Sequence, residues 1–162
     1  MTAAAAGAGA GAGPGAGDLQ GAGDPGWLIS DALVLAIVRI TGTVERPASL
    51  MDLVAATDAM YHLILTAEMI EHAMSRLLPA ALATVDDVGF APTPQGRRLV
   101  AHARGGPGGD PGARIESLLR LLEAVAVTPV PWALHRPTYD AVVLDYGHSL
   151  WQTFRAPGRR RP

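Results

Sequence analysis

The stretch from Thr66 to Leu99 reads TAEMIEHAMSRLLPAALATVDDVGFAPTPQGRRL, and its pattern decides the fold. Up to Pro79, apolar residues recur at i, i+3, i+4, i+7 and i+8, which predicts a helix with one buried face. Thr66 is a good N-cap for this helix, and Pro79 forces it to end or kink. The apolar positions are Ile70, Ala73, Met74, Leu77 and Leu78. The opposite face, expected to be exposed, carries Glu68, Glu71, His72, Ser75 and Arg76.

A two-stranded hairpin is expected after this helix. Residues 82–85 (LATV) favour a strand, 86–89 (DDVG) a turn, and 90–91 the start of a return strand. Residues 93–94, Thr-Pro, then begin another helix, because a threonine N-cap with proline at the first helical position favours helix initiation. Gly96 lets the start of that helix pack closely against the hairpin. The apolar side of the helix holds Leu99, Val100 and Ala103.

Two helices are expected before this stretch. Asp24 and Pro25 form an N-cap and first-turn pair, so the first helix should run from there to about Ile40 and stop at Gly42. Its sequence over 27–38, WLISDALVLAIV, is apolar nearly all round. Such a helix is either central in the fold or part of a dimer interface.

The connection to the second helix, GTVER at 42–46, has room for one short strand. The second helix is expected over about 49–60, because Ser49 and Asp52 have the spacing of a capping box. Its inward positions are Leu50, Leu53, Val54 and Met60.

Two more helices are expected beyond the stretch. The fifth helix covers about 113–127, and the last begins near 136–137 and runs to Phe154. The sequence TPVP at 128–131 separates them. Apolar residues at helical spacing are Ile115, Leu118, Leu119, Leu122, Val125 and Ala126 in the fifth helix, and Tyr139, Val142, Val143, Tyr146, Leu150 and Phe154 in the last.

Composition divides the chain into five parts. Residues 1–23 are almost entirely Ala and Gly and are expected to form a disordered arm, because they hold too little apolar side chain to offset the entropy of ordering. The main domain covers 24–103, and RGGPGGDPG at 104–112 is a linker. A helical extension at 113–154 serves dimerisation or packing, and 155–162 form a basic, disordered tail.

The overall composition excludes several classes of protein. The chain has 162 residues, 49% of them hydrophobic, no cysteine, and a formal charge of -2. Absence of cysteine excludes a disulfide framework, a thiolate metal site and a thiol nucleophile. The longest apolar run is too short to span a bilayer, and the first residues lack the basic and apolar regions of a signal peptide. A cytoplasmic location is therefore expected, with no membrane association.

The order of helix, short strand, two helices, hairpin and helix resembles a winged helix-turn-helix domain. The segment 90–99, FAPTPQGRRL, is similar to the Phe-x-Leu-Thr-Pro-x-Gly-x-x-Leu segment of bacterial regulators of the MarR and PadR groups, and the chain also resembles small actinobacterial proteins. The resemblance implies a mainly α fold with a small β-hairpin wing and additional C-terminal helices. Three positions depart from the pattern: Pro92 replaces an apolar strand residue, Ala81 replaces a capping glycine, and acidic Asp86-Asp87 occupies the wing tip.

Two functions are compatible with this resemblance. The first is a DNA-binding transcriptional regulator, dimeric through the first, fifth and last helices, whose third helix enters the major groove. Its groove-facing residues would be Thr66, His72, Ser75 and Arg76, with Arg97 and Arg98 on the DNA backbone. The alternative is a winged-helix protein–protein interaction module without DNA binding. The resemblance favours the regulator, because most winged-helix proteins bind DNA. The charge of residues 24–104 counts against it without deciding the matter, because six arginines against nine acidic residues leave a net charge of -3, which disfavours phosphate binding.

No catalytic, cofactor or metal site is expected. Glu68 and His72 are helical neighbours but lack a third ligand at a diagnostic spacing, and Asp145 and His148 are read as a surface pair. The glycines of 104–112 lack the Gly-Lys-Ser/Thr ending of a phosphate loop. Four aromatic residues seal the core or line a small-molecule pocket; they are Trp132, Tyr139, Tyr146 and Trp151.

Overall fold

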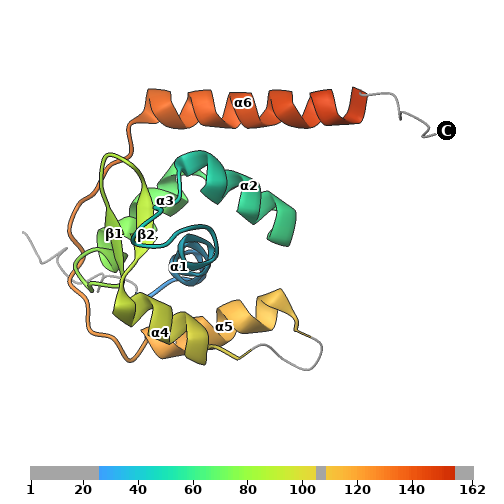
Figure 1. The fold of residues 1–162 in the computed structure, drawn as a ribbon. Coiled ribbons are helices and arrows are strands. Elements are labelled where there is room, and N and C mark those ends of the chain that lie inside the picture. The colour runs from blue at the N-terminus through green and yellow to red at the C-terminus, as the bar shows by residue number, and fades with distance from the viewer. Residues whose placement is uncertain (1–25, 105–108, 156–162) are drawn as a thin grey trace, which may run out of the picture.

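The structure is a computed structural model that describes residues 26–104 and 109–155 (Figure 1). Within these ranges the fold is mainly helical with one two-stranded antiparallel sheet, as expected. The expected arm at 1–23, part of the linker at 104–112 and nearly all of the basic tail at 155–162 lie outside the described residues. The elements are α1 (Ile29–Thr41), α2 (Leu50–Tyr61), α3 (Ala67–Leu77), β1 (Ala83–Val85), β2 (Phe90–Pro92), α4 (Pro94–His102), α5 (Pro111–Leu122) and α6 (Arg136–Arg155).

Helix α1 is the centre of the fold. Figure 1 looks along its axis, with α2 on one side and α4 and α5 on the other, and α1 contacts all three as well as α3 and β2. Every residue from Asp31 to Val38 is buried in this single chain. Packing within the chain therefore explains the apolar residues from Ala32 to Val38, whereas Ile29 and Ile40 near the helix ends are 56% and 49% exposed.

The start of α1 differs from the sequence prediction. Residues 26–28 are not helical, and the helix begins at Ile29 rather than at the Asp24-Pro25 pair. The carboxylate of Asp31 explains this start, because its Oδ2 accepts a hydrogen bond of 2.8 Å from the backbone N–H of Leu28. An acid at the third helical position that reaches back in this way satisfies a free donor of the first turn.

Helix α2 begins as predicted. The hydroxyl of Ser49 accepts from the N–H of Asp52 at 3.1 Å, and the Asp52 carboxylate accepts from the N–H of Ser49 at 2.9 Å.

Two expectations for the residues around the start and end of α2 are wrong. Residues 44–46 form a bend rather than a strand, and the bridge to the sheet comes later, where Ala48 pairs with Phe90. Met60 is 39% exposed instead of inward.

The hairpin has the predicted position and a short second strand. Its register pairs Ala83 with Pro92, Thr84 with Ala91 and Val85 with Phe90. The following α4 starts close to it, because a Cβ on Gly96 would overlap the carbonyl oxygen of Leu82. The Thr93 hydroxyl accepts from the N–H of Gly96 at 3.0 Å, which confirms the predicted cap.

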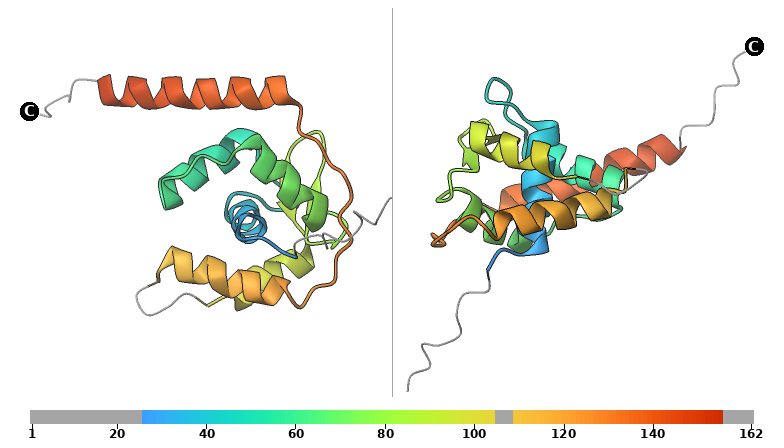
Figure 2. Two further views of the ribbon diagram at one scale, coloured as in Figure 1. Left: turned by 180° about the vertical axis from the view of Figure 1, so that it is seen from behind. Right: turned by 90° about the horizontal axis from the view of Figure 1, so that it is seen from below.

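Helix α5 ends five residues before the predicted position of Val127. It stops at Leu122, and 123–135 form an irregular segment. Trp27 supplies a reason, since its indole N–H donates to the carbonyl of Val125 at 2.8 Å and fixes the chain outside helical geometry. The segment passes along the edge of the molecule and leads into α6, which lies over α2 (Figures 1 and 2).

Candidate interaction surface

The outer face of α3 is acidic and is occupied by the chain's own C-terminal part. We call residues 123–155 the C-terminal arm. Its Arg136 places Nη1 at 2.6 Å from Oε1 of Glu68 and Nη2 at 2.7 Å from Oε2 of Glu71. The guanidinium therefore spans two carboxylates one helical turn apart on α3, a geometry that suits its planar fork of donors.

This ion pair shifts the pKa of both partners. The hydrogen bond from Arg136 is the main cause that lowers the pKa of the Glu68 carboxyl, and the same bond raises the pKa of Arg136. Both changes favour the charged forms. Glu68 and Arg136 are well exposed, with 71% and 47% of their side chains accessible, so water weakens their attraction.

Backbone hydrogen bonds hold the arm along the same face. The N–H of Val130 donates to the carbonyl of Ser75 at 2.8 Å, and the N–H of Leu134 donates to Oε1 of Glu71 at 3.0 Å. The Trp132 ring stands edge-on to Phe90 of β2, with ring centroids 6.2 Å apart and an interplanar angle of 71°. The part of the arm before α6 therefore follows α3 as an irregular segment from the hairpin to the start of α6.

The beginning of α6 is held by two tyrosines. The hydroxyl of Tyr139 donates to the carbonyl of Leu65 at 2.7 Å, and that of Tyr146 donates to Oδ2 of Asp58 at 2.6 Å. The second bond is the main cause that raises the pKa of Tyr146. Leu65 precedes α3 and Asp58 belongs to α2. Helix α6 therefore lies across α2 and α3, the two helices that would form the helix-turn-helix in the winged-helix domain that the sequence resembles.

Arg76 was expected on the exposed face and is instead buried, with 2% of its surface accessible. Its Nη1 lies 3.2 Å from Nδ1 of His72, and its Nε lies 3.9 Å from Oδ2 of Asp31. Because arginine only donates, Nδ1 of His72 accepts this bond and the ring proton sits on Nε2, which is 4.0 Å from Oδ1 of Asp31. The charge of the fully buried Asp31 draws Arg76 inward, since a buried carboxylate requires a partner.

The other expected DNA contacts on α3 have internal roles. The hydroxyl of Thr66 accepts from the N–H of Met69 at 3.2 Å, so it caps the helix as predicted. The hydroxyl of Ser75 donates to the carbonyl of His72 at 2.6 Å. The imidazole of His72 is one-third exposed and opens onto a hollow of about 430 Å³ that Pro131 and Trp132 of the arm also line.

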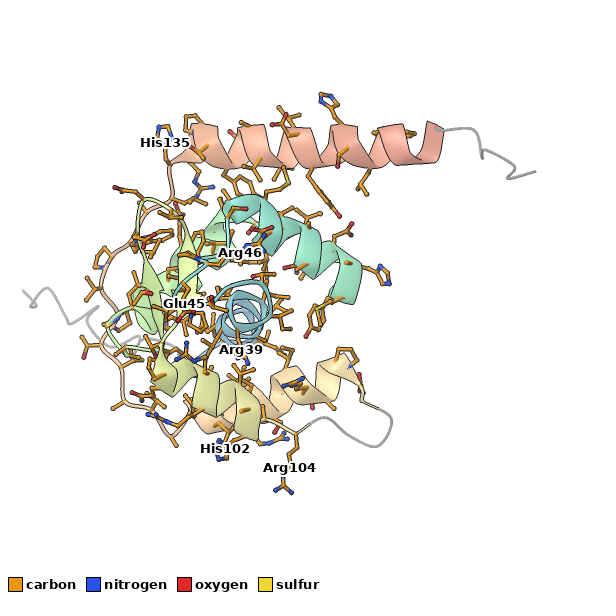
Figure 3. The ribbon with its side chains drawn as sticks, viewed as in Figure 1. Arg39, Glu45, Arg46, His102, Arg104 and His135 are labelled. Atoms are coloured by element: carbon orange, nitrogen blue, oxygen red, sulfur yellow. The ribbon has the colours of Figure 1, made fainter. Side chains whose placement is uncertain are left out.

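Arg97 and Arg98 do not join the face of α3. Both belong to α4, which lies across α1 from α2 and α6 (Figure 1). Figure 3 shows the same separation for other basic groups, with His102 and Arg104 by α4 and His135 at the start of α6. The basic residues of the described ranges therefore do not form one stripe with α3.

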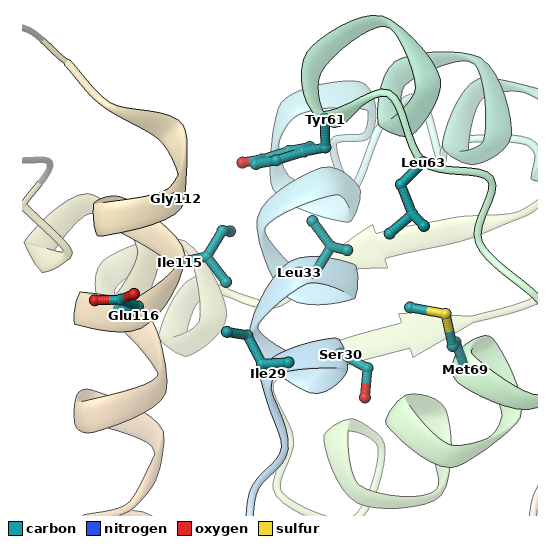
Figure 4. A pocket seen from close by; sticks show the side chains of 9 residues that line it. All are labelled: Ile29, Ser30, Leu33, Tyr61, Leu63, Met69, Gly112, Ile115 and Glu116. Carbon is teal, nitrogen blue, oxygen red and sulfur yellow. The ribbon is translucent and has the colours of Figure 1, made fainter.

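An apolar pocket of about 280 Å³ lies on a different side, between α1, α5 and the turn from α2 to α3 (Figure 4). Its walls are Ile29, Leu33, Tyr61, Leu63, Met69 and Ile115, with Ser30, Gly112 and Glu116 also lining it. Of the four aromatic residues noted in the sequence, none lines this pocket. Burial is the main cause that raises the pKa of Tyr61.

In the described ranges, no group of three or more His, Asp or Glu side chains is placed to hold a metal ion. No helix of residues 26–104 and 109–155 is long and apolar enough to cross a membrane. Comparison of the chain with protein-family models, curated protein sequences and solved structures found no significant match.

Sequence reasoning missed the residues that dominate this surface. Arg136 was treated only as the start of the last helix, and nothing in the sequence links it to Glu68, which lies 68 positions earlier. Asp31 did leave a signal. It is the single charged residue in the apolar run at 27–38, and a charge in such a position calls for a buried partner.

Proposed function

We propose that the chain is a winged-helix protein–protein interaction module, and that the outer face of α3 binds an extended, arginine-bearing segment. The observation that carries this proposal is the pairing of Arg136 with Glu68 and Glu71. A face that holds a guanidinium between two carboxylates has the wrong charge for a phosphate backbone and the right charge for a basic peptide.

The winged-helix class is supported by the element order. A hairpin follows α3, and α4 begins at a Thr-Pro pair, as the resemblance implies. The bridge between Ala48 and Phe90 adds a third strand position to the hairpin just before α2.

The chain's own arm indicates the chemistry of a partner. The segment 129–136 reads PVPWALHR and combines two prolines, one tryptophan and a terminal arginine. It contributes backbone donors at Val130 and Leu134, an aromatic ring against the hairpin, and a guanidinium on the two glutamates. A partner segment of the same composition would make the same contacts after displacing the arm.

A peptide-binding experiment tests this proposal. The Arg136→Glu variant should release the arm by placing a third carboxylate beside Glu68 and Glu71, and should then bind a labelled peptide of residues 128–136 more tightly than the unchanged chain does. Fluorescence anisotropy measures the affinity. The matched control combines Arg136→Glu with Glu68→Ala and Glu71→Ala, which should remove the gain. Equal, weak binding by all three proteins would contradict the proposal.

The second candidate is a DNA-binding transcriptional regulator. The element order favours it, as do the exposed arginine Arg98 and its half-exposed neighbour Arg97. An electrophoretic mobility-shift titration with duplex DNA over a series of salt concentrations separates the candidates. We expect no shift at low salt. A shift that weakens steeply with salt and is lost in the Arg97→Ala/Arg98→Ala variant would favour the DNA-binding regulator instead.

A further inference from the structure

The C-terminal arm leaves part of the space beside the outer face of α3 unfilled. The hollow there has a volume of about 430 Å³, which is far more space than a single water molecule needs. Its lining includes Glu68, Glu71 and His72 of α3 and Pro131, Trp132 and Ala133 of the arm. The arm is therefore docked over a space that its own side chains do not occupy.

The two carboxylates of this hollow face a single guanidinium. Glu68 and Glu71 each carry one negative charge, and Arg136 is the only cation in ion-pair contact with either of them in the described part of the chain. With 21% of its side chain accessible, Glu71 is the less exposed of the two acids, so water screens its charge less. One negative charge at the hollow is therefore left without a counter-charge.

The groups behind the hollow do not supply this counter-charge. His72 carries a single ring proton, because its Nδ1 accepts the bond from Arg76. The positive charge of Arg76 is itself opposed by the buried Asp31. A balancing charge would therefore have to come from the side of the hollow that the arm lines.

Ala133 is the position of the arm from which a side chain could supply that charge. The register of the arm is fixed on both sides of it, because the N–H groups of Val130 and Leu134 donate to acceptors on α3. The Trp132 ring is already held edge-on to Phe90. Ala133 is exposed, lines the hollow and carries only a methyl group, so a longer side chain has room there while the backbone stays in place.

We propose that the outer face of α3 selects partner segments with two basic residues: an arginine in the place of Arg136, and a lysine or arginine three positions earlier, in the place of Ala133. This inference rests on the proposed peptide binding by α3 and names its specificity. Complementary charges at a fixed spacing favour a partner with the matching residues and disfavour one with an acid at the same place. The chain's own arm brings one basic residue of the two, so it is the weaker ligand and can be displaced.

Hydrogen exchange of the arm in the full chain tests the second cation without any partner. At low salt, Ala133→Lys should raise the protection of the Val130 and Leu134 amides about two- to fivefold, the range expected of one partly exposed ion pair. The gain should disappear when Glu68→Gln is added, because Glu71 and Arg136 then balance each other. The matched control is Ala126→Lys, which adds the same charge at an exposed position of the arm that does not line the hollow and should give no gain.

Peptide binding connects the hollow to a partner. On the Arg136→Glu variant, a labelled peptide of residues 128–136 that carries Ala133→Lys should bind more tightly than the unchanged peptide by a similar factor. A peptide that carries Ala133→Glu should bind more weakly, and high salt should reduce both differences. Fluorescence anisotropy measures the three affinities.

The outcomes separate this inference from the function on which it rests. Equal binding of the unchanged and the lysine peptides would overturn the two-cation specificity and leave the proposed function standing. Failure of every peptide, together with a gain in arm protection from Ala133→Lys, would overturn the proposed function and retain the second cation at the hollow. Absence of a gain in both experiments would overturn the inference entirely.

Discussion

Helix α3 takes part in two clusters of charge, one buried and one exposed, and the two differ in their contact with water. On the inner side, Asp31 and Arg76 are buried with 0% and 2% of their surfaces accessible, beside His72. On the outer side, Arg136 and Glu68 stand in water. In the inner cluster, Nε of Arg76 lies 3.9 Å from Oδ2 of Asp31, and in the outer cluster the two contacts of Arg136 are 2.6 and 2.7 Å long.

The difference in exposure to water decides how much each cluster contributes to the stability of the fold. Exposed ion pairs contribute little to stability because water screens the charges and the long side chains lose freedom. A buried charge is costly once its partner is removed, because it then has neither water nor an opposite charge. The inner cluster therefore secures the fold, while the outer cluster secures the position of the arm.

Loss of the inner carboxylate should have the largest effect. Asp31→Ala leaves Arg76 buried without its charge partner and removes the cap on Leu28, so the free energy of unfolding should fall by about 3–5 kcal/mol. Urea unfolding followed by circular dichroism measures this change. The double variant Asp31→Leu/Arg76→Met should recover most of the loss, because no charge then remains buried. A loss below about 1 kcal/mol for the single variant would show that the inner cluster is not buried as described.

A change at the end of α3 should stabilise the fold without touching either cluster. Ala81 has φ of 53°, in the left-handed region that disfavours residues with a Cβ. Ala81→Gly should therefore raise the free energy of unfolding by about 1 kcal/mol. Ala80→Gly is the control, because Ala80 does not have a positive φ and therefore has no such strain to relieve, and the change should destabilise the fold. Thermal unfolding distinguishes the two, and a loss of stability in Ala81→Gly would contradict the strain.

Removal of the outer arginine should change local rather than global stability. Arg136→Ala should speed hydrogen exchange and proteolysis across 128–155, while urea unfolding of the whole chain changes little. Arg120→Ala, at an exposed arginine of α5, should alter neither measurement. If Arg136→Ala lowered global stability as much as Asp31→Ala, the distinction between the two clusters would be wrong.

Acid should produce the smallest effect at the outer cluster, through the Glu68 carboxyl. The hydrogen bond from Arg136 lowers the pKa of Glu68 below its usual 4.5, so folding with the arm docked favours the carboxylate. The stabilisation that the Glu68 carboxylate gives to the docked arm is fully present above pH 4.5. It is lost as the pH falls through the lowered pKa of Glu68 in the docked state. In the unchanged chain, the protection of the arm amides against hydrogen exchange, taken relative to the intrinsic exchange rate at each pH, should therefore fall in this acidic range. The acid dependence should be absent from Arg136→Ala.

Much of the fold could be predicted because its signals are local. Thr66, Ser49 and Thr93 cap their helices as expected, since a cap involves residues only three positions apart. The errors in the fold arose where a distant residue changed the outcome. Trp27 fixes the carbonyl of Val125, 98 positions away, outside the helical geometry that periodicity alone predicted for α5.

The candidate site was harder to predict for the same reason. Helical periodicity assigned Arg76 to the exposed face of α3, because the pattern holds no information on Asp31 of α1. It also left Glu68 and Glu71 free for solvent or a partner, whereas Arg136 reaches them from 68 and 65 positions away. In both cases the sequence correctly identified which side chains carry charge but not which charges meet.

Local patterns in the sequence specify the helices, the hairpin, their caps and the apolar faces that form the core, because each of these features depends on residues only a few positions apart. The central position of α1, the burial of Arg76 and the docking of the arm on α3 follow instead from tertiary contacts. Those outcomes depend on which surfaces come together in space, because burial and charge pairing act between residues that are far apart along the chain.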